Sequence, residues 1–185
     1  MRIGHINLEK SMNGMGEHFV KLVEGLDRLG MTQHVIVRNK ALARRLAVCE
    51  NVTVGPTATT AVTAYCLMPS VAVVHTHDEA SGHAGLLLTL TRSIPYVATR
   101  RSALPPGRNP IIRSVYGRAA SLICPSDRAA AAVLDQGLAV PVDVIPNISF
   151  KEDEDCEDIA NHIAAEHLPV YRRAVDSWRV PALLL

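Results

Sequence analysis

The chain has 185 residues, a formal net charge of +1 and a hydrophobic content of 48%. That length suits one compact domain with a short appendage, and the high apolar content with little net charge excludes intrinsic disorder. The near-neutral charge and an aromatic content of only 4% argue against a nucleic-acid-binding protein. No apolar stretch is long enough to predict a membrane span, and the first residues lack the small-residue cleavage site of a secretory signal.

Short apolar runs alternate with helical repeats along the first four fifths of the chain. Strands are predicted at residues 3–7, 35–37, 52–54, 71–75, 96–99, 122–124 and 142–145. Helices are predicted at 19–29, 40–48, 58–67, 85–91, 111–119 and 126–137, with Gly30 ending the first and Ser126–Asp127 capping the last. This alternation predicts an α/β protein with a single Rossmann-like, doubly wound, mainly parallel sheet of about seven strands. Right-handed crossovers bring the carboxyl ends of such strands to one edge, where ligands bind.

The pattern changes after residue 149. Residues 151–158 hold six acidic side chains, which predicts a solvated linker at 150–158. A helical stripe then shares one face: Ala160, Ile163, Ala164, His167, Tyr171, Ala174, Val175 and Trp178. Pro169 removes a backbone donor from it, so a kink or two short helices are expected. Residues 159–185 are therefore predicted to be a helical appendage that docks back on the domain formed by residues 1–149.

Four cysteines without Cys-x-x-Cys spacing predict reduced thiols in a cytoplasmic protein. A glycine-containing loop, with Gly14, Gly16 and Glu17, joins the first strand to the first helix. Glycines let a ligand approach the backbone, and the free amides of a helix start attract anions. The third glycine of a dinucleotide-binding fingerprint is missing, and an ordinary flexible turn explains the loop equally well.

A polar cluster, His75 to Glu79, follows a predicted central strand. Strand alternation points His75 and His77 to one face and Asp78 to the other. A His-x-His pair with His83 as third ligand would suit a metal, but no ligand from a separate element is evident, so no metal is expected. A histidine here would instead bind hydroxyl groups or accept a proton near neutral pH.

Arg100 and Arg101 close the next predicted strand, inside a stretch from Glu79 to Asp127 that contains no other acidic residue. Guanidinium groups suit a phosphate or a carboxylate because they donate two parallel hydrogen bonds. A solvated surface position explains them equally well. The same arginine-rich stretch predicts at most peripheral contact with anionic lipid.

Together these segments resemble the N-terminal, acceptor-side half of a family-four glycosyltransferase of the GT-B fold. The matching segments are 2–7 with 14–17, 73–78 with Gly85, 94–99, 119–126 with Arg128 and Gly137, and 144–148. They occur in the family's order and cover residues 1–149. Residues 162–168 with 171–173 resemble the last helix of such enzymes, which returns from the second domain to pack on the first.

The resemblance implies transfer of a sugar from a nucleotide-activated donor to a glycan or glycolipid acceptor, in envelope polysaccharide or lipopolysaccharide synthesis. Gly14, Gly16 and Glu17 would lie in the acceptor loop, and Arg100 and Arg101 would bind a phosphate or carboxylate. His77 or Asp78 would orient or deprotonate a hydroxyl group. The fold implies no metal and no cofactor besides the nucleotide sugar, because side chains and a helix N-terminus stabilise the leaving diphosphate.

Two departures from the family pattern qualify this expectation. Arg101 stands where the family often has a histidine, and the sequence continues from residue 149 to the last helix without the donor-binding domain. The chain is therefore expected to be an acceptor-binding domain that does not catalyse transfer alone. A separate donor-binding subunit or a second copy would complete it, in the cytoplasm or at the inner membrane face. Two alternatives stay open: a non-enzymatic glycan-binding or regulatory module, and a metal-dependent hydrolase built on His75, His77 and His83.

Overall fold

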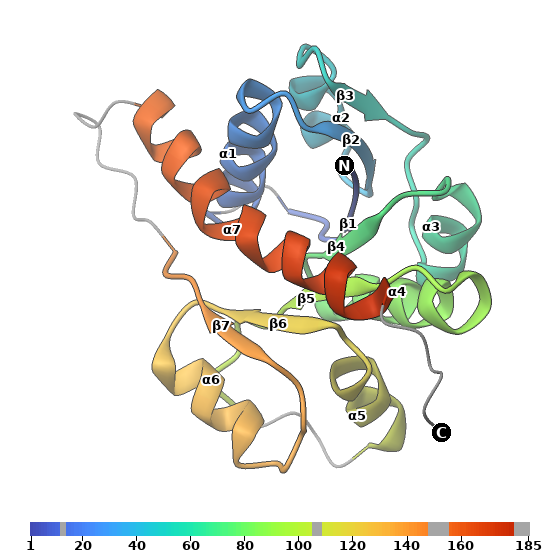
Figure 1. The fold of residues 1–185 in the computed structure, drawn as a ribbon. Coiled ribbons are helices and arrows are strands. Elements are labelled where there is room, and N and C mark those ends of the chain that lie inside the picture. Colours follow the sequence, from blue (N-terminus) through green and yellow to red (C-terminus); the bar gives the residue numbers. More distant parts are fainter. Residues whose placement is uncertain (12–13, 105–108, 148–155, 180–185) are drawn as a thin grey trace.

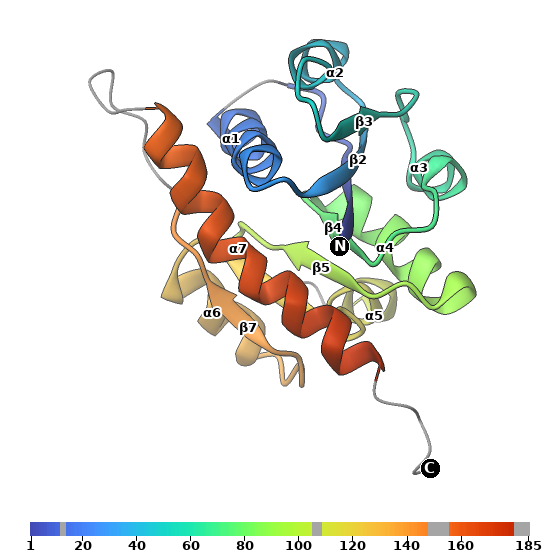
Figure 2. The same cartoon turned by 45° about the horizontal axis from the view of Figure 1, so that its top comes forward.

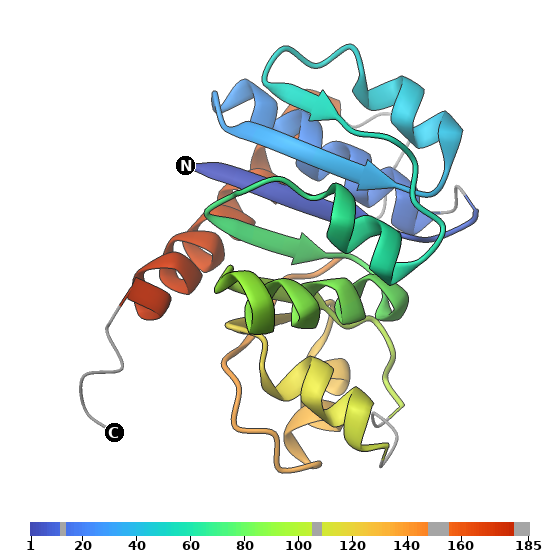
Figure 3. The same ribbon diagram turned by 90° about the vertical axis from the view of Figure 1, so that its right-hand side faces the viewer.

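Seven parallel strands run through the centre of the molecule in the order β3-β2-β1-β4-β5-β6-β7, as the computed structural model shows (Figures 1 and 3). The structure describes residues 1–11, 14–104, 109–147 and 156–179. The strands are β1 (Arg2–Asn7), β2 (Thr32–Val37), β3 (Val52–Val54), β4 (Val73–Thr76), β5 (Tyr96–Thr99), β6 (Ser121–Cys124) and β7 (Val142–Val144). The helices are α1 (Gly14–Arg28), α2 (Lys40–Leu46), α3 (Ala61–Leu67), α4 (Glu79–Arg92), α5 (Pro110–Gly117), α6 (Asp127–Leu134) and α7 (Cys156–Arg179). The predicted α/β class and parallel sheet are confirmed.

Helices cover both faces of the sheet. The chain first runs from β1 to the edge strand β3, then crosses back to β4 and continues to the opposite edge strand, β7. Because the crossovers are right-handed, α1 and α2 cover one face of the sheet and α3 to α6 cover the other. Val74, Leu88 and Tyr96 belong to the large apolar cluster on the α3–α6 face. Ile3 and Leu22 belong to the cluster on the opposite face, where α7 also packs.

Local capping explains where several helices begin and end. Asn39 and Ser126 accept hydrogen bonds from the first backbone amides of α2 and α6, and Ser126 thus has its predicted role. Gly30 adopts a φ of +69°, which ends the turn after α1 as predicted. The predicted start of a helix at residue 85 was wrong, because Asp78 and Ser81 form a capping box that begins α4 at Glu79.

Helix α7 lies across the sheet beside α1, and it also contacts β4 and β5 (Figures 1 and 2). Gly25 on α1 permits this contact, since a Cβ there would overlap the backbone of Ala160 on α7. The predicted stripe is buried, apart from Trp178, which is 40% exposed. The C-terminal helix therefore docks on the domain as expected.

Two expectations about this C-terminal segment need correction. Of the kink and the two short helices expected at Pro169, the two short helices are wrong, because α7 is continuous through that residue. Proline has no N–H, so the carbonyl of Ala165 loses the amide partner that residue 169 would otherwise supply. Ala165 and Pro169 are both exposed, so water can bind this carbonyl instead. The helix also starts at Cys156, inside the predicted linker, because Glu157 and Asp158 favour the first turn of a helix. Residues 148–155 and 180–185 of the predicted linker and appendage lie outside the described residues.

Cys124 is buried in β6 as predicted, and the described thiols of Cys49, Cys66 and Cys124 are free. None of the described helices has both the length and the apolar character that crossing a bilayer requires.

Candidate functional site

A cavity of about 240 Å³ opens at the carboxyl edge of the sheet, where β1, β4 and β5 end. The strand order reverses direction between β1 and β4, and crevices at such points are where open α/β sheets bind ligands. Its lining comes from four segments: Glu9 after β1; His77, Asp78 and Glu79 after β4; Thr99, Arg100, Arg101 and Ser102 at the end of β5; and Tyr116 on α5. We call this cavity the edge pocket.

Asp78 ties the end of β1 to the start of α4. One carboxylate oxygen accepts the backbone amide of Leu8 at 2.7 Å, and the other accepts that of Ser81 at 2.9 Å. The carboxylate is therefore held in one orientation at the wall of the edge pocket. Each oxygen keeps a second lone pair for a further donor.

Three histidines cluster at the edge pocket: His77, which lines it, and His5 and His75 from the adjacent strands β1 and β4. Nδ1 of His5 on β1 lies 3.1 Å from Nε2 of His77, and the rings of His75 and His77 are 3.9 Å apart. This confirms that His75 and His77 share one face. His18 on α1 and His167 on α7 join the cluster, each with its ring within 6 Å of another histidine ring. We call these five residues the histidine layer.

Burial makes the histidine layer neutral at physiological pH. It lowers the pKa of His5 and His18 to about 3 and that of His167 to about 4. Burial, reinforced by neighbouring histidines and Arg101, also lowers the pKa of His75 and His77 well below the ordinary value. Neutral imidazoles exchange hydrogen bonds with one another, whereas protonated rings at these distances would repel.

Among the described residues, His5, His75 and His77 form the group of three whose nitrogen atoms come close enough to share a metal ion. Both nitrogens of His75 are already hydrogen-bonded, to Tyr171 at 2.6 Å and to Thr99 at 2.7 Å. Binding a metal through His75 would cost one of these hydrogen bonds. His83 is not in this group; its ring lies 3.1 Å from the carbonyl of Glu79 in its own helix. The ligand set His75, His77 and His83 of the hydrolase alternative is therefore not brought together among the described residues.

Arg100 and Arg101 reach the edge pocket in different ways. Arg100 is buried, donates to the Tyr116 hydroxyl at 3.1 Å, and lies over the Tyr116 ring at 4.9 Å. Arg101 is half-buried and donates to the carbonyl of His77 at 3.0 Å. Burial lowers the pKa of Arg101, while the carboxylates of Glu9 and Asp78 oppose that shift. The Nε atoms of both arginines have no hydrogen-bond partner among the described residues.

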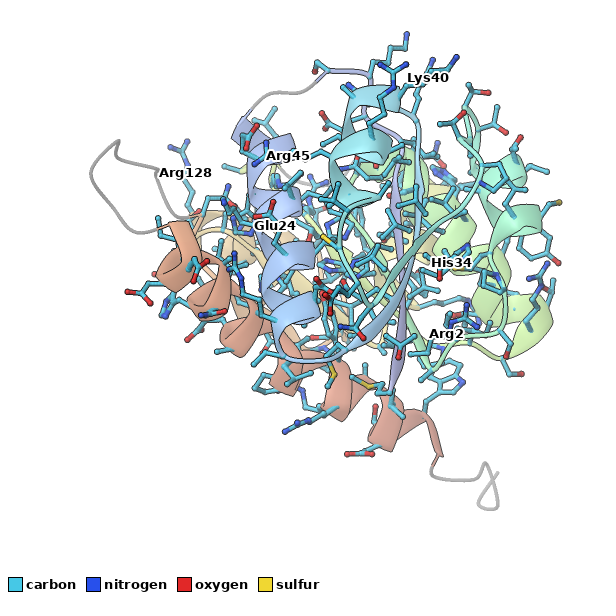
Figure 4. All side chains as sticks on the ribbon, turned by 90° about the horizontal axis from the view of Figure 1, so that it is seen from above. Arg2, Glu24, His34, Lys40, Arg45 and Arg128 are labelled. Atoms are coloured by element: carbon cyan, nitrogen blue, oxygen red, sulfur yellow. The ribbon has the colours of Figure 1, made fainter. Side chains whose placement is uncertain are left out.

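The structure thus brings four of the seven predicted site residues together: His77, Asp78, Arg100 and Arg101. The other three are not in the lining of the edge pocket. Gly14 and Gly16 form the first turn of α1, and Glu17 accepts two hydrogen bonds from Arg45 on α2 (2.9 and 2.8 Å). Figure 4 shows Arg45 over α1 near Glu24, with which it forms a second ion pair at 3.8 Å. Part of the predicted loop, residues 12–13, lies outside the described residues.

Sequence reasoning missed several residues of the site. Glu9, Thr99 and Tyr116 line the edge pocket, and His5 completes the cluster of three histidines there. Glu9 and Thr99 stand where predicted strands end, which is a usable signal in a parallel sheet. His5 carries no such signal, because it lies within a buried strand and its partners depend on the strand order.

Comparisons with known proteins give a family match for residues 12–148 and two solved structures with a similar fold. A family model described as Glycosyltransferase Family 4 matches residues 12–148. Two crystal structures of Anabaena Alr3699/HepE are similar, one in complex with UDP (TM-score 0.59) and one with UDP and glucose (TM-score 0.60). Each is 15% identical over 80% of this chain, which spans only 44% of the length of those structures. A comparison with curated protein sequences gave no match.

Proposed function

This chain belongs to glycosyltransferase family 4, and we propose that its edge pocket binds the acceptor of a sugar transfer. The observation that carries the proposal is the combination in one cavity of Arg101, the fixed carboxylate of Asp78, and a neutral His77. An anionic sugar acceptor needs both a cationic group and hydrogen-bond acceptors. Its anionic part needs a cation, and its hydroxyl groups need hydrogen-bond acceptors.

In this proposal Arg101 binds a phosphate or carboxylate of the acceptor, with Arg100 holding the wall through Tyr116. His77 or Asp78 orients the hydroxyl that attacks the sugar. The Asp78 carboxylate is already held by two backbone amides, so it is available in a fixed direction. The donor is a nucleotide sugar, and a UDP-sugar is the first to test because the Anabaena structures hold UDP.

We further infer that residues 1–149 form the acceptor-side domain and that this chain does not transfer sugar by itself. The acceptor would be an envelope glycan or a lipopolysaccharide-type glycolipid, met in the cytoplasm or at the inner membrane face. The donor side would come from another polypeptide or from further residues. A non-enzymatic glycan-binding module remains the second candidate, since the edge pocket is formed within one domain.

Titration of the ¹⁵N-labelled chain with glucose 1-phosphate and with glucose tests the proposal. Glucose 1-phosphate should shift the amide signals of Thr99 and Arg101, and neutral glucose should bind more weakly. Arg101→Gln should reduce the affinity about 10-fold or more, because a charge-assisted bidentate contact is lost. Arg128→Gln, an exposed arginine outside the edge pocket, is the matched control and should change nothing. Equal binding of both sugars, or equal loss in both variants, would contradict an anionic acceptor site.

Turnover separates the two candidate functions. Transfer from UDP-glucose to a glycan by this chain alone would show that the incompetence proposed here is wrong. Transfer only after addition of a donor-binding partner would support the acceptor-side domain. Binding of glycans without transfer under both conditions would favour the non-enzymatic module.

A further inference from the structure

None of the described side chains of α7 lines the edge pocket, yet two hydrogen bonds connect this helix to it. The Tyr171 hydroxyl on α7 lies 2.6 Å from Nδ1 of His75. The other ring nitrogen of His75, Nε2, lies 2.7 Å from the Thr99 hydroxyl. Tyr171 and His75 are fully buried, whereas Thr99 lines the edge pocket.

Because His75 is neutral, the donor and the acceptor of each of these two hydrogen bonds can be assigned. Burial holds its pKa well below the ordinary value, so the ring has one N–H and one lone pair. With the proton on Nδ1, the ring would donate to Tyr171, whose own hydroxyl proton would find no other acceptor among the described residues. With the proton on Nε2, Tyr171 donates to Nδ1 and Nε2–H donates to Thr99. The second arrangement is favoured, because a buried donor without an acceptor is costly.

We infer that Tyr171 fixes the Nε2–H tautomer of His75 and thereby turns the Thr99 hydroxyl into a donor directed at an anionic group in the edge pocket. The Thr99 oxygen accepts from His75, so its own proton is left for another acceptor. That proton adds to the donors of Arg100 and Arg101, which line the same cavity. Tyr171 is a positioning residue, since it acts through His75. The inference rests on the proposed acceptor site and makes α7 part of its regulation.

The first test needs no ligand. Long-range ¹H–¹⁵N NMR of the wild-type chain should show His75 protonated on Nε2 alone. Protonation on Nδ1, or on both nitrogens at pH 7, would overturn the inference. A wild-type chain that binds no inorganic phosphate would contradict the acceptor site, and the tautomer would still decide the role of Tyr171.

The second test removes the Tyr171 hydroxyl, which donates to His75. Tyr171→Phe keeps the ring and deletes the hydroxyl, so His75 should lose its single tautomer. The affinity for inorganic phosphate should fall roughly tenfold or more, as for one hydrogen bond to a charged group. Tyr65→Phe is the matched control, because it deletes a tyrosine hydroxyl that pairs with Thr91, outside the edge pocket. Unchanged phosphate affinity in Tyr171→Phe would overturn the inference.

Variants of Thr99 test the same bond at a half-buried position and do not depend on the stability of Tyr171→Phe. Thr99→Val should lose as much phosphate affinity as Tyr171→Phe, and Thr99→Ser, which keeps the hydroxyl, should retain it. The double variant Tyr171→Phe with Thr99→Val should bind no worse than Thr99→Val, because both changes remove one donor. Equal losses in Thr99→Ser and Thr99→Val, or additive losses in the double variant, would overturn the inference.

Discussion

The two faces of the sheet are built differently. The face under α3 to α6 is packed with apolar groups around Leu88 and Tyr96. The face under α1 and α7 buries the histidine layer between its apolar clusters: His5, His18, His75, His77 and His167. Apolar burial stabilises a fold directly, whereas buried histidines cost stability whenever they must be kept neutral. Polar groups buried at such a cost point to function, and this layer reaches the edge pocket through His77.

Of the changes predicted below, a lower pH should have the largest effect on stability, and it should act through the histidine layer. The pKa values of about 3 for His5 and His18 and about 4 for His167 lie below the 6.5 of an ordinary histidine. Below pH 6.5 the unfolded chain therefore binds more protons than the folded chain, and the free energy of unfolding falls as the pH drops towards 4. Each of these histidines should remove about 2 kcal/mol between pH 7 and pH 5, measured by urea unfolding.

Two variants test how much of this pH dependence comes from the histidine layer. His167→Gln should shrink the difference in unfolding free energy between pH 7 and pH 5 by about 2 kcal/mol, because one of the titrating groups is gone. Leu88→Ala, on the apolar face, should lower stability by about 3 kcal/mol equally at both pH values, since it only creates a cavity. If both variants changed the pH dependence alike, the histidine layer would not be its source.

Glycines offer a second comparison of the faces. A Cβ at Gly25 would overlap the backbone carbonyl of Ala160 on α7, but one at Gly85 would meet the Tyr96 ring at 2.6 Å. Both changes overpack buried sites, but Gly25 faces a backbone and Gly85 faces buried side chains, so Gly25→Ala should cost about 3 kcal/mol and Gly85→Ala about 2 kcal/mol. Urea unfolding measures both, and only Gly25→Ala should also shift the NMR signals of Tyr171. Equal costs would mean that α7 adjusts as easily as a side chain.

The sequence alone was enough to predict the layers, because apolar periodicity reports the burial of each element. It located His77, Asp78, Arg100 and Arg101 at one edge, since all four follow strands of a parallel sheet. It could not identify His5, whose contact with His77 exists only because β1 pairs with β4. Pairing between strands distant in sequence leaves no local trace.

Other features depended on how helices turn toward one another. Glu17 reads as part of a ligand loop, but the rotation of α1 against α2 directs it to Arg45. The link from Tyr171 to Thr99 likewise needs α7 to cross β4 and β5 at one register. Apolar periodicity predicts that such a helix docks, and packing decides which side chains meet.

The smallest effect is expected where α7 meets β7, at the surface. Arg173 donates to the Asp143 carboxylate, which also accepts from Ser121 at 2.7 Å. The Arg173 side chain is 49% exposed, so solvent screens the pair, and Arg173→Ala should cost less than about 1 kcal/mol in urea unfolding. The cost should shrink further in 1 M salt, where the screening length is only about 3 Å. Arg172→Ala, one residue away and exposed, has no ion pair among the described residues and is the control. A loss of 2 kcal/mol or more in Arg173→Ala alone would mean that this ion pair, and not the histidine layer with its apolar neighbours, holds α7 to the sheet.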